Sequence, residues 1–70
     1  METEWIEVID ENRRRTRILA LYPMIETRNQ NGIGEERGTP IYRSLDGETL
    51  NKIGGKFIAQ RSRRRFTPVA

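Results

Sequence analysis

The sequence predicts an all-β fold, a small meander of five or six short strands closed or half-closed into a barrel of SH3-like or OB-like size. Three observations predict it. The chain has 70 residues, enough for one domain. Short runs rich in β-branched and aromatic residues recur along it, which is typical of strands. The dipeptides Asp46-Gly47 and Gly54-Gly55 separate such runs, and both signal tight hairpin turns.

The first expected strand covers residues 3–10, where Trp5, Ile6, Val8 and Ile9 are concentrated. A helix is the alternative, because Trp5, Val8 and Ile9 also fit a helical spacing. The polar stretch that follows, residues 10–15, suits a turn, since Asp and Asn side chains bond to nearby backbone there.

The second expected strand runs through residues 16–28 and is apolar on both faces in its middle. Pro23 has no N–H to give to a ladder, so the strand is expected to bend, bulge or become an edge there. Residues 29–40 contain three Gly and a single apolar anchor, Ile33, and are expected to form a long loop. Its part near residues 29–38 is predicted to be flexible.

The rest of the chain reads as a meander with strands near residues 40–45, 48–53, 56–61 and 65–69. Asp46-Gly47 and Gly54-Gly55 are expected to be two-residue turns, and the Arg-rich segment 61–65 is expected to lead into the last strand. The single domain is therefore expected to span residues 1–70.

Composition argues against an enzyme. The chain contains no Cys and no His, so it lacks the commonest nucleophile, general base and metal ligand. Asp46 and Glu48 form a carboxylate pair, but Asp46 has a turn role and so small a meander leaves little room for a pocket. We expect no catalytic residue, no metal and no cofactor. With a thin core and no disulfide, added stability would come from association.

The charge distribution is uneven. Residues 1–11 contain five acidic residues and no basic one, whereas residues 49–70 contain six basic residues and no acidic one. The acidic start does not fit a signal or transit peptide, and no apolar run is long enough to cross a membrane. The chain is therefore expected to be cytoplasmic and to have no membrane partner.

Eight of the thirteen basic residues lie in two short windows, residues 13–17 and 61–65. Guanidinium groups recognise phosphates, and a small β-barrel with clustered Arg and exposed rings can hold nucleic acid. This predicts a non-enzymatic nucleic-acid-binding module. Its candidate binding residues are Arg13, Arg14, Arg15, Arg17, Lys52, Lys56, Arg61, Arg63, Arg64 and Arg65.

Other interpretations stay open at this stage. The Arg windows could be ordinary solvated turns, and Trp5, Phe57 and Phe66 are expected to be core residues rather than stacking surfaces. If the first and last strands pair, acidic residues of the first would face basic residues of the last. The alternative functions are a protein–protein adaptor or inhibitor that uses an exposed strand edge, or a homodimeric structural subunit. The protein would then be a monomer or a homodimer.

Overall fold

The computed structural model describes residues 1–69, and these residues form strands and turns with no helix. The all-β prediction is therefore confirmed. None of the described residues forms a helix that could span a membrane. The strands are β1 (Glu2–Ile9), β2 (Arg15–Tyr22), β3 (Met24–Asn29), β4 (Gly32–Arg37), β5 (Ile41–Arg43), β6 (Thr49–Ile53), β7 (Lys56–Ala59) and β8 (Arg65–Pro68).

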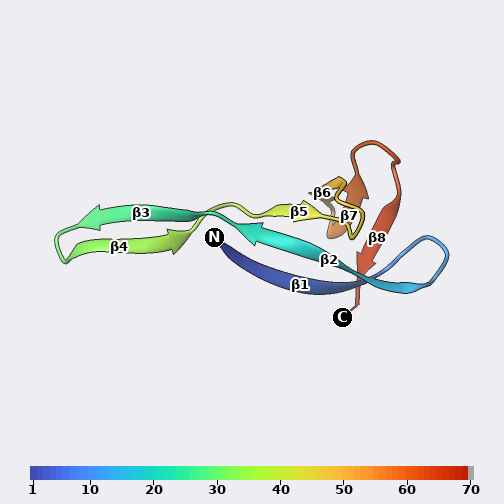
Figure 1. Cartoon of the computed structure of the whole chain (residues 1–70), viewed down its shortest axis with the longest axis horizontal. Coiled ribbons are helices and arrows are strands. Elements are labelled where there is room, and N and C mark those ends of the chain that lie inside the picture. Colours follow the sequence, from blue (N-terminus) through green and yellow to red (C-terminus); the bar gives the residue numbers. More distant parts are fainter. Residues whose placement is uncertain (70) are drawn as a thin grey trace.

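Six of the strands form a closed ring in the order β1-β2-β5-β6-β7-β8, with antiparallel neighbours throughout. The pairs Val8↔Pro68 and Ile9↔Thr67 close it by joining β1 to β8. The expected meander is present, because every other neighbour in the ring also follows in sequence, apart from the inserted β3–β4 hairpin (Figure 1).

The core lies inside the ring and consists of side chains from five of its six strands. Alternation along each strand sends one set of side chains inward. The buried set is Val8, Ile18, Ala20, Leu50, Phe57, Ala59 and Phe66. Tyr42 packs against Phe57 with ring centroids 4.7 Å apart. The expectation that Phe57 and Phe66 are core residues is confirmed.

Strands β3 and β4 form a two-stranded arm, residues 24–37, that projects away from the ring and gives the molecule its 50 Å length (Figure 1). Pro23 interrupts the expected strand, because β2 ends at Tyr22 and β3 begins at Met24. The expected long loop over residues 29–40 is wrong, since β4 occupies its middle. Pairing with β3 orders β4, although every residue of β4 is exposed. The flexibility of residues 29–38 stays a prediction.

The two Gly-containing turns of the meander differ in type. Gly54 and Gly55 have φ of 58° and 77°, as a two-residue type I′ turn requires, and this turn is confirmed. At the other turn only Gly47 has positive φ, at 86°. Its N–H bonds to the Ser44 carbonyl, and the Ser44 N–H bonds to the Glu48 carbonyl. The hairpin therefore has a three-residue loop with a bulge, not the two-residue turn expected from Asp46-Gly47.

Candidate nucleic-acid interface

The first Arg window begins in the turn between β1 and β2, residues 10–14, here called the N-terminal turn. Asp10 organises it: its Oδ1 accepts hydrogen bonds from the N–H groups of Asn12 and Arg14, each at 2.9 Å. Arg13 has a φ of 62° and so occupies the left-handed region, where Gly is normally favoured. The carboxylate of Asp10 is thus engaged with backbone, and the turn directs its Arg residues into solvent.

The second Arg window forms the turn between β7 and β8, residues 60–64, here called the C-terminal turn. The Arg63 N–H donates to the Ala59 carbonyl at 3.1 Å, and the Ala59 N–H donates to the Arg64 carbonyl at 2.9 Å. Arg63 also has a φ of 62°. Both Arg-rich turns therefore place an Arg at a left-handed position.

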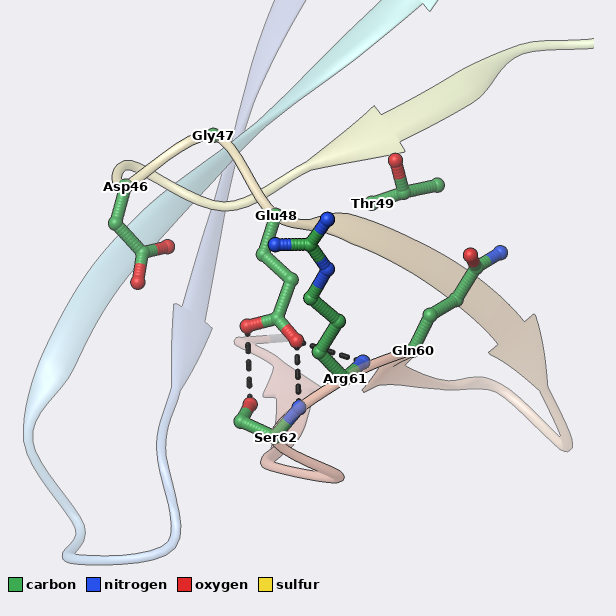
Figure 2. Close-up of a pocket in the computed structure, with 7 residues that line it drawn as sticks. All are labelled: Asp46, Gly47, Glu48, Thr49, Gln60, Arg61 and Ser62. Atoms are coloured by element: carbon green, nitrogen blue, oxygen red, sulfur yellow. Dashed lines mark hydrogen bonds between the residues drawn. The ribbon is translucent and has the colours of Figure 1, made fainter.

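Glu48, at the end of the β5–β6 turn, holds the C-terminal turn in place. Its Oε1 accepts the N–H groups of Arg61 at 2.8 Å and Ser62 at 2.6 Å, and its Oε2 accepts the Ser62 hydroxyl at 3.0 Å. Figure 2 shows the Glu48 carboxylate pointing onto this turn at one side of an open pocket. The side chain of Glu48 is only 11% exposed. The hydrogen bond from the Ser62 backbone, together with the others, lowers the pKa of Glu48.

Arg64 differs from the other Arg residues of its window because it is already paired. Its Nη2 lies 2.7 Å from Asp46 Oδ2 and 3.3 Å from Glu48 Oε2. Its guanidinium also lies over the ring of Phe66, 5.6 Å from the centroid. Arg64 is among the binding residues predicted from the sequence, but in the structure it pairs with Asp46 and Glu48 and supports the C-terminal turn.

The two turns meet at one end of the ring. The Arg65 N–H donates to Glu11 Oε1 at 2.8 Å, although 54 residues separate the two in sequence. A shallow pocket between the turns is lined by Asp10, Glu11, Lys56, Arg63, Arg65 and Thr67. Lys56, Arg63 and Arg65 thus lie together in this pocket. We define the basic end as these three cations together with the remaining cations of the two turns, Arg64 excepted, and of the start of β2, which are Arg13, Arg14, Arg15 and Arg61. Within residues 1–69, none of these cations makes an ion pair.

Arg17 extends the basic end along the outer surface of β2 and stacks on Trp5. Its guanidinium carbon lies 4.7 Å from the Trp5 ring centroid, and Trp5 is 52% exposed. The expectation that Trp5 is a core residue is wrong. Ile6 and Val8 face the core, and successive residues of a strand face opposite sides, so Trp5 points outward. The alternation of Ile6 and Val8 was the signal that could have revealed it.

Lys52 is not brought together with the two turns. It lies opposite Phe57 on the face of β6 that also carries buried Leu50, whereas Lys56 lies opposite Ile53 on the other face. Of the ten residues selected from the sequence, the structure places Lys56, Arg63 and Arg65 in one pocket. Arg61 lines another pocket, and Arg64 differs from its neighbours in the C-terminal turn by its ion pairs.

In the described part of the chain, β1 and β8 form no ion pair with each other, although Asp10 and Glu11, which follow β1, line a pocket with Lys56, Arg63 and Arg65. β1 and β8 do pair as the sequence alternative required, but the residues opposite β1 are Thr67 and Pro68. The N-terminal carboxylates instead face the arm: Arg37 Nε lies 2.5 Å from Glu2, and Arg37 Nη1 lies 4.0 Å from Glu4. The cross-strand pairs that this alternative assigned to Glu4 and Glu7 are therefore absent from the described residues, whereas Asp10 does lie beside C-terminal cations.

The basic end offers several solvated guanidinium groups, each with five N–H donors, beside an exposed indole. This set matches phosphate oxygens and, at Trp5, a flat ring. The described residues include no group of three or more acidic, His or Cys side chains that could hold a metal ion. No protein family, curated protein or solved structure gives a significant match to this chain.

Proposed function

We propose that the protein is a non-enzymatic nucleic-acid-binding module and that its basic end holds the phosphate backbone. The proposal is supported by the seven cations of the basic end, of which Lys56, Arg63 and Arg65 share a pocket with the carboxylates of Asp10 and Glu11. Both carboxylates accept hydrogen bonds from backbone N–H groups. A positive field thus extends from this end into solvent.

One observation carries the proposal: Arg occupies the left-handed position in both turns of the basic end. A residue with a Cβ is disfavoured there by about 1–2 kcal/mol. The β5–β6 and β6–β7 turns place Gly47, Gly54 and Gly55 at such positions. If only the stability of the fold mattered, Gly would be favoured at positions 13 and 63 as well. A cation is therefore retained at a cost in stability, which a charged partner explains.

Trp5 and Arg17 give the proposed site a second kind of contact. A base can stack on an exposed ring, and such stacking contributes about 1–3 kcal/mol per base. Arg17 already lies over one face of the ring at 4.7 Å. A strand that follows the Arg residues of β2 would therefore bring an unstacked base to Trp5, so single strands are expected to bind better than duplexes.

A salt titration with matched single substitutions tests the proposal. Labelled single-stranded and duplex DNA and RNA are titrated at about 50 and 200 mM salt, and the slope of log K against log salt is measured. Arg63→Ser removes a cation of the basic end and is expected to reduce the slope by about 0.7 on single strands. Lys52→Ser is the control, because it removes one charge on the other face of the sheet.

Equal losses for Arg63→Ser and Lys52→Ser would show that net charge alone attracts the nucleic acid and that the basic end is not the site. No binding by the wild type at about 50 mM salt would refute the function itself. Arg64 is left unchanged throughout, because its ion pairs to Asp46 and Glu48 make its loss a change in stability.

A further inference from the structure

Strand β3 has an edge that no strand of the described chain covers. Within the ring each strand has a neighbour on both sides, but β3 pairs only with β4. β1 covers the corresponding edge of β2 as far as the pair Glu2↔Tyr22. Beyond Pro23 the same edge continues as β3 and is open to solvent. Neither arm strand contains the Lys or Pro residues that commonly protect a free edge.

One hydrogen bond fixes which peptide groups point toward this edge. The Gly38 N–H donates to the Pro23 carbonyl at 2.6 Å, so Pro23 and Gly38 form a hydrogen-bonded pair. Bonding alternates along an antiparallel ladder, and therefore the odd-numbered residues of β3 bond to β4. The even-numbered residues, Met24, Glu26 and Arg28, direct their N–H and C=O groups outward to the free edge.

We propose that the free edge of β3 binds the β3 edge of a second copy of this chain, antiparallel, about a twofold axis at Thr27. In this register Glu26 lies opposite Arg28 of the second copy, and Arg28 lies opposite its Glu26. Both residues have outward peptide groups, so each of these pairs forms two backbone hydrogen bonds. The contact is self-complementary, as a twofold interface must be.

The registers with the axis at a neighbouring residue of β3 that faces the free edge are less favourable. An axis at Glu26 or at Arg28 places that residue opposite its own copy, and like charges directly opposite each other are destabilising. On β4 the outward residues are Ile33, Glu35 and Arg37. Any twofold register that sets Glu35 opposite Arg37 of the second copy also sets Glu36 opposite Glu36 of that copy. The sequence of β3, with an acid and a base on either side of Thr27, thus favours one arrangement.

The dimer also corrects an unfavourable feature of the isolated arm. Glu26 and Glu35 lie directly opposite each other across β3 and β4. The nearest cation of the same strand, Arg28, is 3.9 Å from Glu26, and both side chains are largely exposed. Dimerisation brings Arg28 of the second copy beside Glu26. It also turns a two-stranded hairpin, which is marginally stable alone, into a four-stranded sheet.

The two rings do not obstruct this arrangement. The register sets Pro23 opposite Asn31 of the second copy, so the turn of the second arm ends where the first ring begins. Figure 1 shows the arm extending clear of the ring, with only the start of β1 near its base. The two rings would therefore lie at opposite ends of the shared sheet.

Charge exchange at two positions tests the proposal by sedimentation equilibrium. Glu26→Arg and Arg28→Glu each replace both opposite-charge pairs by like-charge pairs, and each is expected to raise the dimer dissociation constant at least about tenfold. The double variant E26R/R28E regenerates the pairs with reversed sign and is expected to restore dimerisation. Glu36→Arg is the control, because it makes the same charge change on β4.

The expected results differ from those of simple arm stability. Glu26→Arg improves pairing within the arm, since the introduced guanidinium would face Glu35, so a weakened dimer cannot be ascribed to a damaged hairpin. Arg28→Pro removes an outward N–H together with the guanidinium that would pair with Glu26 of the second copy, and is expected to give a monomer with an intact ring. A monomeric wild type at about 1 mM, where even weak dimers with a Kd in that range form, or single variants that dimerise like the wild type, would overturn the proposal. So would a double variant that stays monomeric.

Discussion

In the proposed function, Arg13 and Arg63 link stability to binding at the scale of single residues. Each has φ of 62°, which glycine adopts without the steric cost of a Cβ. We expect Arg13→Gly and Arg63→Gly each to raise the free energy of unfolding by about 0.5–1 kcal/mol and to weaken nucleic-acid binding. Urea denaturation and binding titrations on the same samples measure both. A variant that loses stability would show that the Arg side chain supports its turn.

Glu48 makes the C-terminal turn sensitive to acid. Its pKa lies below the ordinary value of 4.5, because the Ser62 backbone N–H and further donors stabilise the carboxylate. The pKa of Asp46 is also lowered, from its ordinary value of 3.8, because Ser44 and Arg64 donate hydrogen bonds to its carboxylate. A carboxylate with a depressed folded pKa stabilises the protein fully above its unfolded pKa. This contribution is lost as pH falls through the folded value.

Glu48→Gln removes the charged carboxylate while keeping the size of the side chain. We expect this variant to melt at a lower temperature than the wild type at pH 7, and the difference to shrink steadily between about pH 5 and pH 2. Melting curves followed by circular dichroism across this range provide the measurement. A difference that stays constant over the whole range would mean that the charge of Glu48 is unimportant and that only its shape matters.

At the scale of elements, the β6–β7 turn depends on backbone conformation alone. Gly54 has a φ of 58°, yet a Cβ added there would meet no atom within 4 Å. Gly54→Val is therefore expected to destabilise the protein by about 1–2 kcal/mol through left-handed strain, without a steric clash. Gly54→Asn should cost clearly less, because Asn tolerates this region. Equal losses in chemical denaturation for the two variants would contradict this explanation.

The strands that the sequence predicts well are those whose own residues specify them. β1, β2 and the strands flanking Gly54-Gly55 contain β-branched and aromatic side chains and strong turn signals. β4 could not be predicted in this way, because its residues are all exposed and its order comes from pairing with β3. The expected strand over residues 16–28 continues beyond Pro23 as β3, but nothing in the sequence indicated that β4 would be its partner.

Some features of the candidate site could likewise be predicted from the sequence, whereas others could not. The charge pattern of the sequence predicted both Arg windows, and the two hairpin turns meet at one end of the ring. The pairing of Arg64 could not be predicted, because its partners Asp46 and Glu48 are 18 and 16 residues away in sequence. The exposure of Trp5 was missed because the pleat of β1, rather than hydrophobicity, decides which side chains face the core.

At the scale of the whole molecule, charge is divided along the long axis. The arm and the N-terminal end of β1 hold five carboxylates against Arg28 and Arg37. Eleven of the thirteen basic residues belong to the ring and its turns. In the proposed dimer the acidic arms would lie at the centre and the two basic ends farthest apart. One nucleic-acid strand that reached both ends would be bound with avidity, well above the affinity of one end.

The closing contact between β1 and β8 also governs how the chain acquires its structure during synthesis. Val8 meets Pro68 across nearly the whole chain, and contacts between residues so distant in sequence form slowly. The β1–β2 hairpin can form as soon as it leaves the ribosome, but Val8 and Ile18 then face water until Phe57 and Phe66 arrive. Assembly of the core must therefore wait for the C-terminal strand, and the nascent chain presents an uncovered apolar surface until then.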